Sequence, residues 1–581
     1  MKCLSLSKLL VFFLVALSSS LFALPSQAVI KSRMLADLET IKNIFEIKYA
    51  PANWKKEFAD WDLDVEYEAA KAKIMNLKDP TVKDFQVILK HFLLSTKDYH
   101  VGARFFSTEM SSLPFTIKGA EGRYFITHID PLAELFYSFS LQVGDEVLEF
   151  GGKPIGHVIA ELKKQELGGN TAETDQAEAE FLLTSRHGET GDIIPRGPIS
   201  VKLKGLSDGK IKRTILRWDH FPERVKDVAL ISQLKGNVAH CLGSYGEFQS
   251  HSSKVPFIER YMVHPHFEAP HFKSEGPYAN PDGIGAWASF LPCLGEKIWE
   301  GSVDLAFHAY IFLSPSGKKV GCIRIPHYME DEEAAFEFCN LLRELNEKTD
   351  ALVIDQLNNP GGAVFYLYAL ASMLTDRSLE TPKHRIALTQ EEVYQAVNLL
   401  PALNYIQTDA DAKKALGETL GGYPVTMDVI RNLREFFRFV INEWEKGNHL
   451  TNPTFVLGVD KIQPHPKVQY TKPLLVLINE RCYSCGDFFP AILQDNHRAV
   501  LFGRRTAGAG GYVISSKFPN YMGISRIKTT GSIAERVNKQ PIENLGVVPD
   551  ITYELTTRDL QEDYVDCVDA ILETLERMLE S

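Results

Sequence analysis

The chain has 581 residues, of which 45% are hydrophobic and 24% charged, and its formal net charge is −12. This length predicts about two to four domains, and the balanced composition excludes an intrinsically disordered protein. The acidic charge, with no runs of Lys or Arg, argues against nucleic-acid binding, which requires a basic face.

The N-terminus, residues 1–28, has the pattern of a secretory signal peptide. A short basic stretch precedes an unbroken apolar run at 9–17, and Ser26 and Ala28 supply small residues at the positions that signal peptidase reads. A membrane anchor is the alternative, but the apolar run is short for a helix that spans a bilayer. The sequence therefore predicts a secreted protein without a stable membrane anchor.

Residues 29–106 are expected to form an N-terminal helical region. Apolar side chains recur at helical spacing from Leu35 to Tyr49, and Asp79-Pro80-Thr81 has the composition of a further helix start. The mature chain is thus expected to begin with amphipathic helices.

Residues 107–217 change to the pattern of a β-rich block. Short apolar runs predict strands at 115–117, 124–129, 146–150 and 199–204. Gly144-Asp145 forms a turn before one of these strands and Gly151-Gly152 reverses the chain after it. Across 141–155 the sequence resembles PDZ domains, which bind peptides by adding a strand to a sheet edge. The resemblance implies a PDZ-like domain; an unrelated hairpin with the same two turns is the alternative.

The stretch 236–281, inside a linker at 218–290, has no lasting helical or strand period. It is rich in Pro, His, Gly and Ser, yet it contains an apolar cluster made of Phe257, Ile258, Tyr261, Met262, Val263, Phe267 and Phe272. A free linker does not need such a cluster. We therefore expect an internal inhibitory segment that occupies a groove, with an ordinary surface loop as the alternative.

From residue 291 to 581 strands and helices alternate. The pattern predicts strands at 320–325, 351–355, 474–478 and 499–502, and helices at 331–345, 363–374 and 485–493. Such alternation predicts an α/β architecture with a mostly parallel, buried sheet.

Ser484 is the first candidate catalytic residue. It follows a predicted strand and a polar turn and precedes a helix, so it is expected at a helix N-terminus, where free N–H groups favour negative charge. The N–H of Cys485 is then a candidate oxyanion donor. An N-cap serine without a catalytic role is the alternative, and the sequence lacks the G-x-S-x-G of α/β-hydrolases.

A second loop, Asn358-Asn359-Pro360-Gly361-Gly362, follows the strand predicted at 351–355. Glycine lets backbone N–H groups approach a ligand closely. Gly361 or Gly362 is therefore a candidate for the second oxyanion donor, and an ordinary Pro-Gly connection is the alternative.

These two segments resemble the tail-specific, or carboxyl-terminal processing, serine proteases. The resemblance rests on "IDQLNNPGG" at 354–362, on the segment around Ser484 and on residues 503–511. It implies a crotonase-like α/β catalytic core at 291–581. That family places a lysine base in a turn after the serine, but the turn here reads Gly-Ala-Gly around Ala509. Because alanine cannot accept a proton, either another residue is the base or the protein is inactive.

His100 is the candidate for the missing base. The pKa of histidine lies near neutral pH, which makes it the usual partner of a serine nucleophile. Glu543, in the Gly- and Pro-framed turn "PIENLGVVPD", could orient the imidazole and stabilise its charged form. A structural histidine and a solvated carboxylate are the alternatives.

A narrower resemblance favours the catalytic interpretation. "DYHVGARFF" at 98–106, "YSCGDFFP" at 483–490 and "PIENLGV" at 541–547 are similar to the three active-site segments of the chlamydial protease-like activity factor family. Further matches span nearly the whole mature chain, which is identified as a member of that family.

The family resemblance implies a triad of Ser484, His100 and Glu543. It also implies export from a bacterium that lives inside host cells, cleavage of host proteins, and a homodimer. The family is made as a zymogen that is activated by self-cleavage and loses an internal segment.

The Cys482-x-x-Cys485 pair would suggest a redox or zinc site in another setting. No second such pair and no histidine at ligand spacing accompanies it. We therefore expect neither a metal nor a cofactor, and we expect Cys485 to pack beside the nucleophile.

The predicted function is thus a secreted serine endopeptidase that cleaves proteins or peptides by acyl transfer. Two alternatives stay open. One is a catalytically inert PDZ-containing binding protein, which Ala509 favours, and the other is a Ser-Lys peptidase that uses a remote lysine.

Overall fold

The computed structural model describes residues 26–131, 141–225 and 280–580. The expected signal peptide up to residue 25, and the expected inhibitory segment at 236–281 except for its last two residues, lie outside these ranges. Within the described ranges, no helix combines the length and the apolarity that crossing a bilayer requires.

A seven-stranded sheet forms the centre of the molecule and carries the predicted α/β alternation. Its order is β11–β12–β13–β14–β21–β22–β26, parallel from β13 onwards and antiparallel at the β11 edge. The strands are β11 Glu296–Glu300, β12 Ala309–Leu313, β13 Lys319–Arg324, β14 Ala351–Asp355, β21 Leu474–Ile478, β22 Val500–Gly503 and β26 Ile551–Thr552. Every residue of β14 and β21 is buried, as expected for parallel strands covered on both faces. The predictions at 351–355 and 474–478 are confirmed residue for residue.

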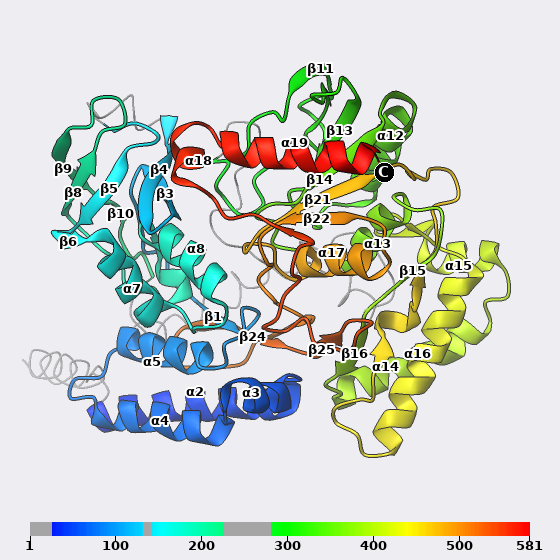
Figure 1. Cartoon of the computed structure of the whole chain (residues 1–581). Coiled ribbons are helices and arrows are strands. Elements are labelled where there is room, and N and C mark those ends of the chain that lie inside the picture. The colour runs from blue at the N-terminus through cyan, green and yellow to red at the C-terminus, as the bar shows by residue number, and fades with distance from the viewer. Residues whose placement is uncertain (1–25, 132–140, 226–279, 581) are drawn as a thin grey trace, which may run out of the picture.

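Helices cover the two faces of this sheet, as Figure 1 shows. One face packs against α12 Glu332–Lys348, α13 Val364–Ser372 and α17 Cys485–Asp495, and the other against α18 Thr557–Gln561 and α19 Val565–Glu580. The three helices predicted in this part of the chain are confirmed to within a few residues at their ends. Three further helices that the sequence analysis did not predict extend the first layer: α14 Gln390–Asn404, α15 Asp409–Leu416 and α16 Met427–Glu445.

The N-terminal region is helical, as predicted. Its helices are α2 Gln27–Lys48, α3 Ala52–Ala59, α4 Leu63–Asn76 and α5 Val82–Leu94. Thr81 caps α5 through a reciprocal capping box with Asp84, which confirms the predicted helix start. The helices share a core with residues from the far end of the chain, Met522, Ile524 and Ile527.

A three-stranded sheet makes this long-range connection. β1 Gly102–Phe105 pairs antiparallel with β24 Ile524–Thr530, which pairs with β23 Val513–Ser516. The N-terminal helices therefore pack against a C-terminal part of the chain (Figure 1).

The β-rich block between these regions contains a sheet of order β3–β4–β5–β8–β9. Its strands are β3 Phe115–Ala120, β4 Arg123–Ile129, β5 Glu146–Phe150, β8 Pro198–Lys204 and β9 Ile211–Arg217. All four predicted strands are present, and both predicted glycine turns adopt positive φ, 88° at Gly144 and 61° and 81° at Gly151 and Gly152. Strand β9 and two helices, α7 Ile155–Glu166 and α8 Ala172–Leu182, were not predicted.

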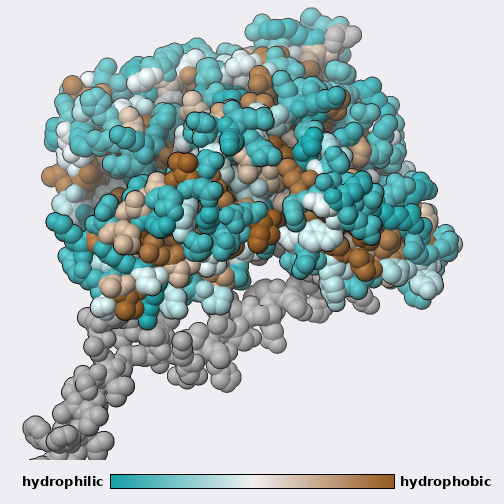
Figure 2. Space-filling model, turned by 90° about the horizontal axis from the view of Figure 1, so that it is seen from below, coloured by the Kyte–Doolittle hydropathy of each residue, from teal (hydrophilic) through white to brown (hydrophobic). Residues whose placement is uncertain are grey.

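Seen from below, the surface is mainly hydrophilic, with separate hydrophobic patches (Figure 2). Exposed apolar side chains of the molecule include Ile47 near the end of α2 and Tyr394 in α14. Scattered residues of this kind are ordinary on folded proteins.

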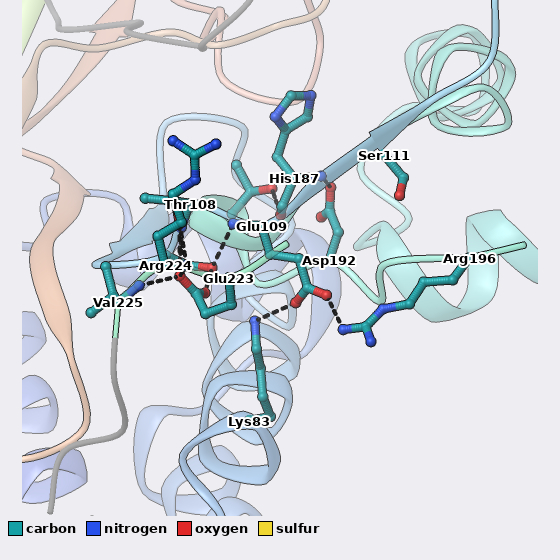
Figure 3. Close-up of polar contacts among 12 residues, drawn as sticks. Lys83, Thr108, Glu109, Ser111, His187, Asp192, Arg196, Glu223, Arg224 and Val225 are labelled. Atoms are coloured by element: carbon teal, nitrogen blue, oxygen red, sulfur yellow. Dashed lines mark hydrogen bonds and ion pairs between the residues drawn. The ribbon is translucent and has the colours of Figure 1, made fainter. Parts of the chain in front are cut away.

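A carboxylate clamp closes the end of the β-rich block. Figure 3 shows Glu223, which follows the short strand β10 Asp219–Phe221, turned towards Thr108. Glu223 accepts hydrogen bonds from Thr108 N (3.0 Å), Thr108 Oγ1 (2.9 Å), Val225 N (3.0 Å) and Ser107 Oγ. Burial raises the pKa of this carboxyl, but these donors outweigh it and lower the pKa to about 2. The clamp therefore fixes residues 223–225, at the C-terminal end of the β-rich block, to Thr108 near its N-terminal end.

We predict that Glu223→Gln lowers the free energy of unfolding by about 1 kcal/mol at neutral pH. The value is small because the carboxylate is partly solvated. A pKa below the unfolded value gives stability that is present above about pH 4 and is lost as the pH falls towards 2. Thermal unfolding across this pH range measures the effect, with Glu121→Gln at an exposed site as the control. If the difference in unfolding free energy between wild type and Glu223→Gln did not change with pH, the clamp would be contradicted.

Candidate active site

Ser484 lies at the start of α17, where the sequence placed it. It follows the fully buried strand β21 and the turn 479–483, and it is itself buried. Its backbone has φ 55° and ψ −116°, a conformation that a residue with a side chain rarely adopts. Such strain is characteristic of functional positions held by their surroundings.

The loop after β14 supplies those surroundings. Asn358 N donates to Asn479 Oδ1 (2.9 Å), Asn479 Nδ2 donates back to Asn358 Oδ1 (2.8 Å), and Tyr483 N donates to Asn359 O (2.9 Å). The two loops that the sequence singled out are therefore bound to each other along their length.

Gly361 lies directly against Ser484. A Cβ atom at Gly361 would lie 2.6 Å from Tyr483 O and 2.7 Å from both Cys485 N and Ser484 Cβ, and its φ is 91°. Only glycine fits this position, for steric and for conformational reasons.

The candidate oxyanion donors differ in their availability. Gly361 N donates to Asn359 Oδ1 (2.8 Å), so this N–H is already used. Gly362 and Cys485 both line a cavity of about 60 Å³ beside Ser484, and Cys485 is the first residue of α17, where N–H groups have no intrahelical acceptor. The geometry favours Cys485 with Gly362 over Cys485 with Gly361.

The cavity beside Ser484 has mainly apolar walls. Tyr368, Phe488 and Ile492 line it together with His384. Burial lowers the pKa of His384 to about 3, so this histidine is neutral at physiological pH. The cavity suits an uncharged side chain.

Both thiols of the Cys482–Cys485 pair are buried and used as donors. Cys482 Sγ donates to Gln356 O and Cys485 Sγ donates to Gly362 O, each at 3.1 Å. Burial raises the pKa of each thiol to about 12, which disfavours the thiolate that metal binding or redox chemistry needs. Cys485 packs beside Ser484, as predicted.

The loop that replaces the family lysine is held by a carboxylate of α17. Asp487 accepts hydrogen bonds from Gly508 N (2.8 Å) and Ala509 N (3.1 Å). Burial raises the pKa of Asp487 to about 7, and these donors oppose the rise. Ala509 is fully buried and packs with Tyr483, so the loop keeps a defined position without a lysine.

His100 is buried immediately before β1. Its backbone N–H donates to Asp98 Oδ1 (2.9 Å), and within the described ranges neither ring nitrogen has a hydrogen-bond partner. Burial lowers the pKa of His100 to about 4, against the attraction of Asp98, so the imidazole is neutral. A neutral imidazole is the form that can act as a general base.

Aromatic side chains bring the histidine and serine segments together. The rings of Tyr99 and Tyr483 meet edge to face with centroids 5.7 Å apart. Tyr99 donates to Asp175 and Tyr483 donates to Glu178, each at 2.8 Å, so both rings are anchored to α8 of the β-rich block. Val513 lines both the cavity beside Ser484 and a cavity of about 180 Å³ beside His100.

Glu543 is fully buried next to the loop of Ala509. One carboxylate oxygen accepts from Gly510 N (3.0 Å) and the other binds the ammonium of Lys55. The structure thus brings Glu543 into the same region, but its described hydrogen bonds go to Lys55 and Gly510 rather than to His100.

Comparison with known proteins gives this geometry a family context. Residues 109–225 match the PDZ domain family, and residues 319–553 match peptidase family S41. A protein of Chlamydia muridarum is 37% identical over 95% of this chain and 94% of its own length, and one of Chlamydia trachomatis is 37% identical over 93% and 92%. The crystal structure of mature CPAF matches with a TM-score of 0.82 and 35% identity, over 95% of this chain and 98% of that one.

The chain belongs to the CPAF, or chlamydial protease-like activity factor, family of S41 peptidases. It is therefore a serine protease that acts on protein substrates, and the predicted PDZ domain is confirmed. A second CPAF structure, complexed with lactacystin, matches with a TM-score of 0.81. Membership in a peptidase family argues against the inert binding protein that Ala509 favoured.

Several residues of this CPAF-family site were not identified from the sequence. Lys55 carries no local motif, and its contact with Glu543 joins residues that are far apart in the chain. Asp98 lies inside the segment of His100 and bonds its backbone N–H, but the sequence analysis gave it no role. Asp487 lies in the first turn of α17, where an acidic residue is ordinarily favourable, so its bonds to the loop of Ala509 became visible only in the structure.

We predict that Gly361→Ala both destabilises the protein and abolishes most of its activity. The left-handed φ costs about 1–2 kcal/mol for a residue with a side chain, and the new Cβ would in addition overlap backbone atoms of Tyr483 and Cys485. Gly317→Ala is the matched control, because its φ is 78° but its Cβ would meet open space. Chemical denaturation and peptide cleavage measure the two effects. Equal stability losses in both variants would contradict the close contact with Ser484.

Proposed function

We propose that the chain is a secreted serine endopeptidase in which Ser484, His100 and Glu543 form the catalytic triad. The observation that carries the proposal is the strained Ser484 at the start of α17, which shares a cavity with Cys485 and Gly362. A serine hydroxyl and two backbone N–H groups around one cavity are the elements that acyl transfer requires.

The reaction would proceed through an acyl-enzyme. Ser484 Oγ attacks the scissile carbonyl carbon while His100 takes the hydroxyl proton, and the N–H groups of Cys485 and Gly362 stabilise the oxyanion. His100 then returns the proton to the leaving amine. A water molecule, deprotonated by His100, then attacks the ester carbonyl carbon. As the bond to Ser484 Oγ breaks, His100 returns this proton to Ser484 Oγ and the second product leaves as the carboxylic acid.

The state of His100 supports its role as the base. Burial keeps it neutral, and its ring is free of described hydrogen-bond partners. The triad still has to close, since Glu543 binds Lys55 and Gly510. Catalytic hydrogen bonds commonly tighten only in the complex with substrate.

We further propose that the chain is made as a zymogen that cuts itself and loses an internal segment around 236–281. An open triad is what a precursor that awaits processing would have. By family likeness the enzyme would be a homodimer that is exported into the host cell and cleaves host proteins. Ser484→Ala, which removes the nucleophile, tests the self-cleavage directly.

We predict that Ser484→Ala and His100→Ala each reduce kcat/KM for an unfolded protein substrate by on the order of 10⁴ or more. Glu543→Gln should cost less, because it disturbs the base rather than the atom that forms the bond. Ser207→Ala and His157→Ala, at exposed positions, are the matched controls. Wild-type turnover by His100→Ala would disprove the triad.

We also predict that wild-type protein fragments near both ends of 236–281, whereas Ser484→Ala protein stays intact there. Mass spectrometry of the matured enzyme measures the fragments, and the same spectra reveal whether the chain begins after residue 28. Cleavage of the precursor around 236–281 should be faster at higher protein concentration if one protomer cuts another. A fully active enzyme with 236–281 uncut would rule out the zymogen.

A further inference from the structure

Lys55 is a buried cation inside the active-site region. It belongs to α3 of the N-terminal helices, and its side chain has no solvent exposure. Its ammonium group binds Glu543 Oε1, Asn544 Oδ1 (2.7 Å) and Lys97 O (2.8 Å). All three N–H donors of the ammonium group are therefore used.

These three acceptors come from the two segments that carry His100 and Glu543. Lys97 O lies three residues before His100, and Asn544 directly follows Glu543. Asn544 Nδ2 also donates to Lys97 O (2.7 Å), so the two segments are tied both directly and through Lys55. The contact spans 488 residues of sequence between Lys55 and Glu543.

Lys55 opposes the effects that favour the protonated form of Glu543. Burial and the nearby Asp98 raise the pKa of Glu543 to about 8, although Lys55 and the backbone N–H of Gly510 both lower it. His100 is faced by Asp98, by Lys528 of β24 and by Lys55 itself. Without Lys55, this desolvated carboxyl close to Asp98 would keep its proton to a still higher pH and would be less able to stabilise an imidazolium.

Stability alone is a poor explanation for such a pair. Burying two opposite charges costs several kcal/mol of desolvation per ion, and well-packed apolar residues often serve as well or better. The geometry also argues against a base role, because Lys55 Nζ is directed to Glu543, Asn544 and Lys97 O and has no described contact with Ser484.

We propose that Lys55 is a positioning residue of the active site, which holds Glu543 as a carboxylate and fixes its loop against the His100 segment. The proposal rests on the proposed triad. It gives the N-terminal helices a direct part in catalysis, because α3 delivers the charge that the triad carboxylate needs.

Lys55→Met in the active enzyme tests the proposal, with kcat/KM measured against pH. The active form needs an ionised Glu543 and a neutral His100, and loss of Lys55 raises the pKa of both groups. The acidic limb of the profile should therefore move to higher pH, with about a tenfold loss on that limb for each unit of displacement. KM for a short peptide should change little, and activity should recover partly at alkaline pH. Lys56→Met, at the adjacent and exposed lysine, is the matched control.

Lys55→Met alone could fold poorly, because it leaves the buried Glu543 without its partner. The double variant Lys55→Met with Glu543→Gln removes both members of the pair, so it provides a second test. If Lys55 acts through Glu543, the double variant should be about as active as Glu543→Gln alone. A uniform loss at all pH values, or losses that multiply in the double variant, would reduce Lys55 to a structural residue. Full activity of Glu543→Gln would instead overturn the triad, so the two failures are distinguishable.

Discussion

The parallel pairing of β14 with β21 is the constraint on which the active site depends. Asp355 lies opposite Leu477 in this register, so the two strands end at the same edge of the sheet. The loops that follow must then pack against each other, and Asn358 and Asn479 join them through mutual hydrogen bonds. This close packing forces glycine at position 361 and holds Ser484 in its strained conformation.

The proposed base, His100, comes from outside that α/β unit. Asp98 accepts hydrogen bonds from Tyr49 OH (3.0 Å) and from Thr530 Oγ1 (2.8 Å) at the end of β24. The segment of His100 is therefore fixed between an N-terminal helix and the antiparallel β1–β24 pair. Ser484 and His100, the proposed nucleophile and base, are supplied by separate structural units, and Tyr99 and Tyr483 meet between them. A site assembled in this way is sensitive to anything that moves the units apart.

Buried charges in this region are paired or hydrogen-bonded, as low dielectric surroundings require. Asp487 holds the loop of Ala509 through backbone N–H groups, so the loop keeps its place although the family lysine is absent. Lys55 and Glu543 form the other buried pair. In both cases a buried ionisable side chain fixes a loop of the active-site region through hydrogen bonds to its backbone N–H groups.

The sequence by itself determined the α/β core, the PDZ-like strands and the catalytic candidates. Continuous apolar runs such as 351–355 and 474–478 mark buried parallel strands, and glycine turns and family motifs mark local structures that depend on neighbouring residues. The candidates Ser484, His100 and Glu543 were chosen in this way, because each lies in a short, distinctive segment. The helices α14–α16, which carry no such motif, were missed.

Only the tertiary structure decided which groups meet. Lys55 reaches Glu543 across 488 residues, and no local pattern encodes such a contact. The same holds for the pairing of β1 with β24 and for the hydrogen bond from Gly361 N to Asn359 Oδ1, which leaves Gly362 as the better candidate for the oxyanion donor. Protonation also depends on the fold: burial makes His100 neutral and favours the protonated form of Glu543, and Lys55 opposes that effect at Glu543. Sequence patterns report local preference and periodicity, whereas desolvation and long-range pairing exist only once the chain has folded.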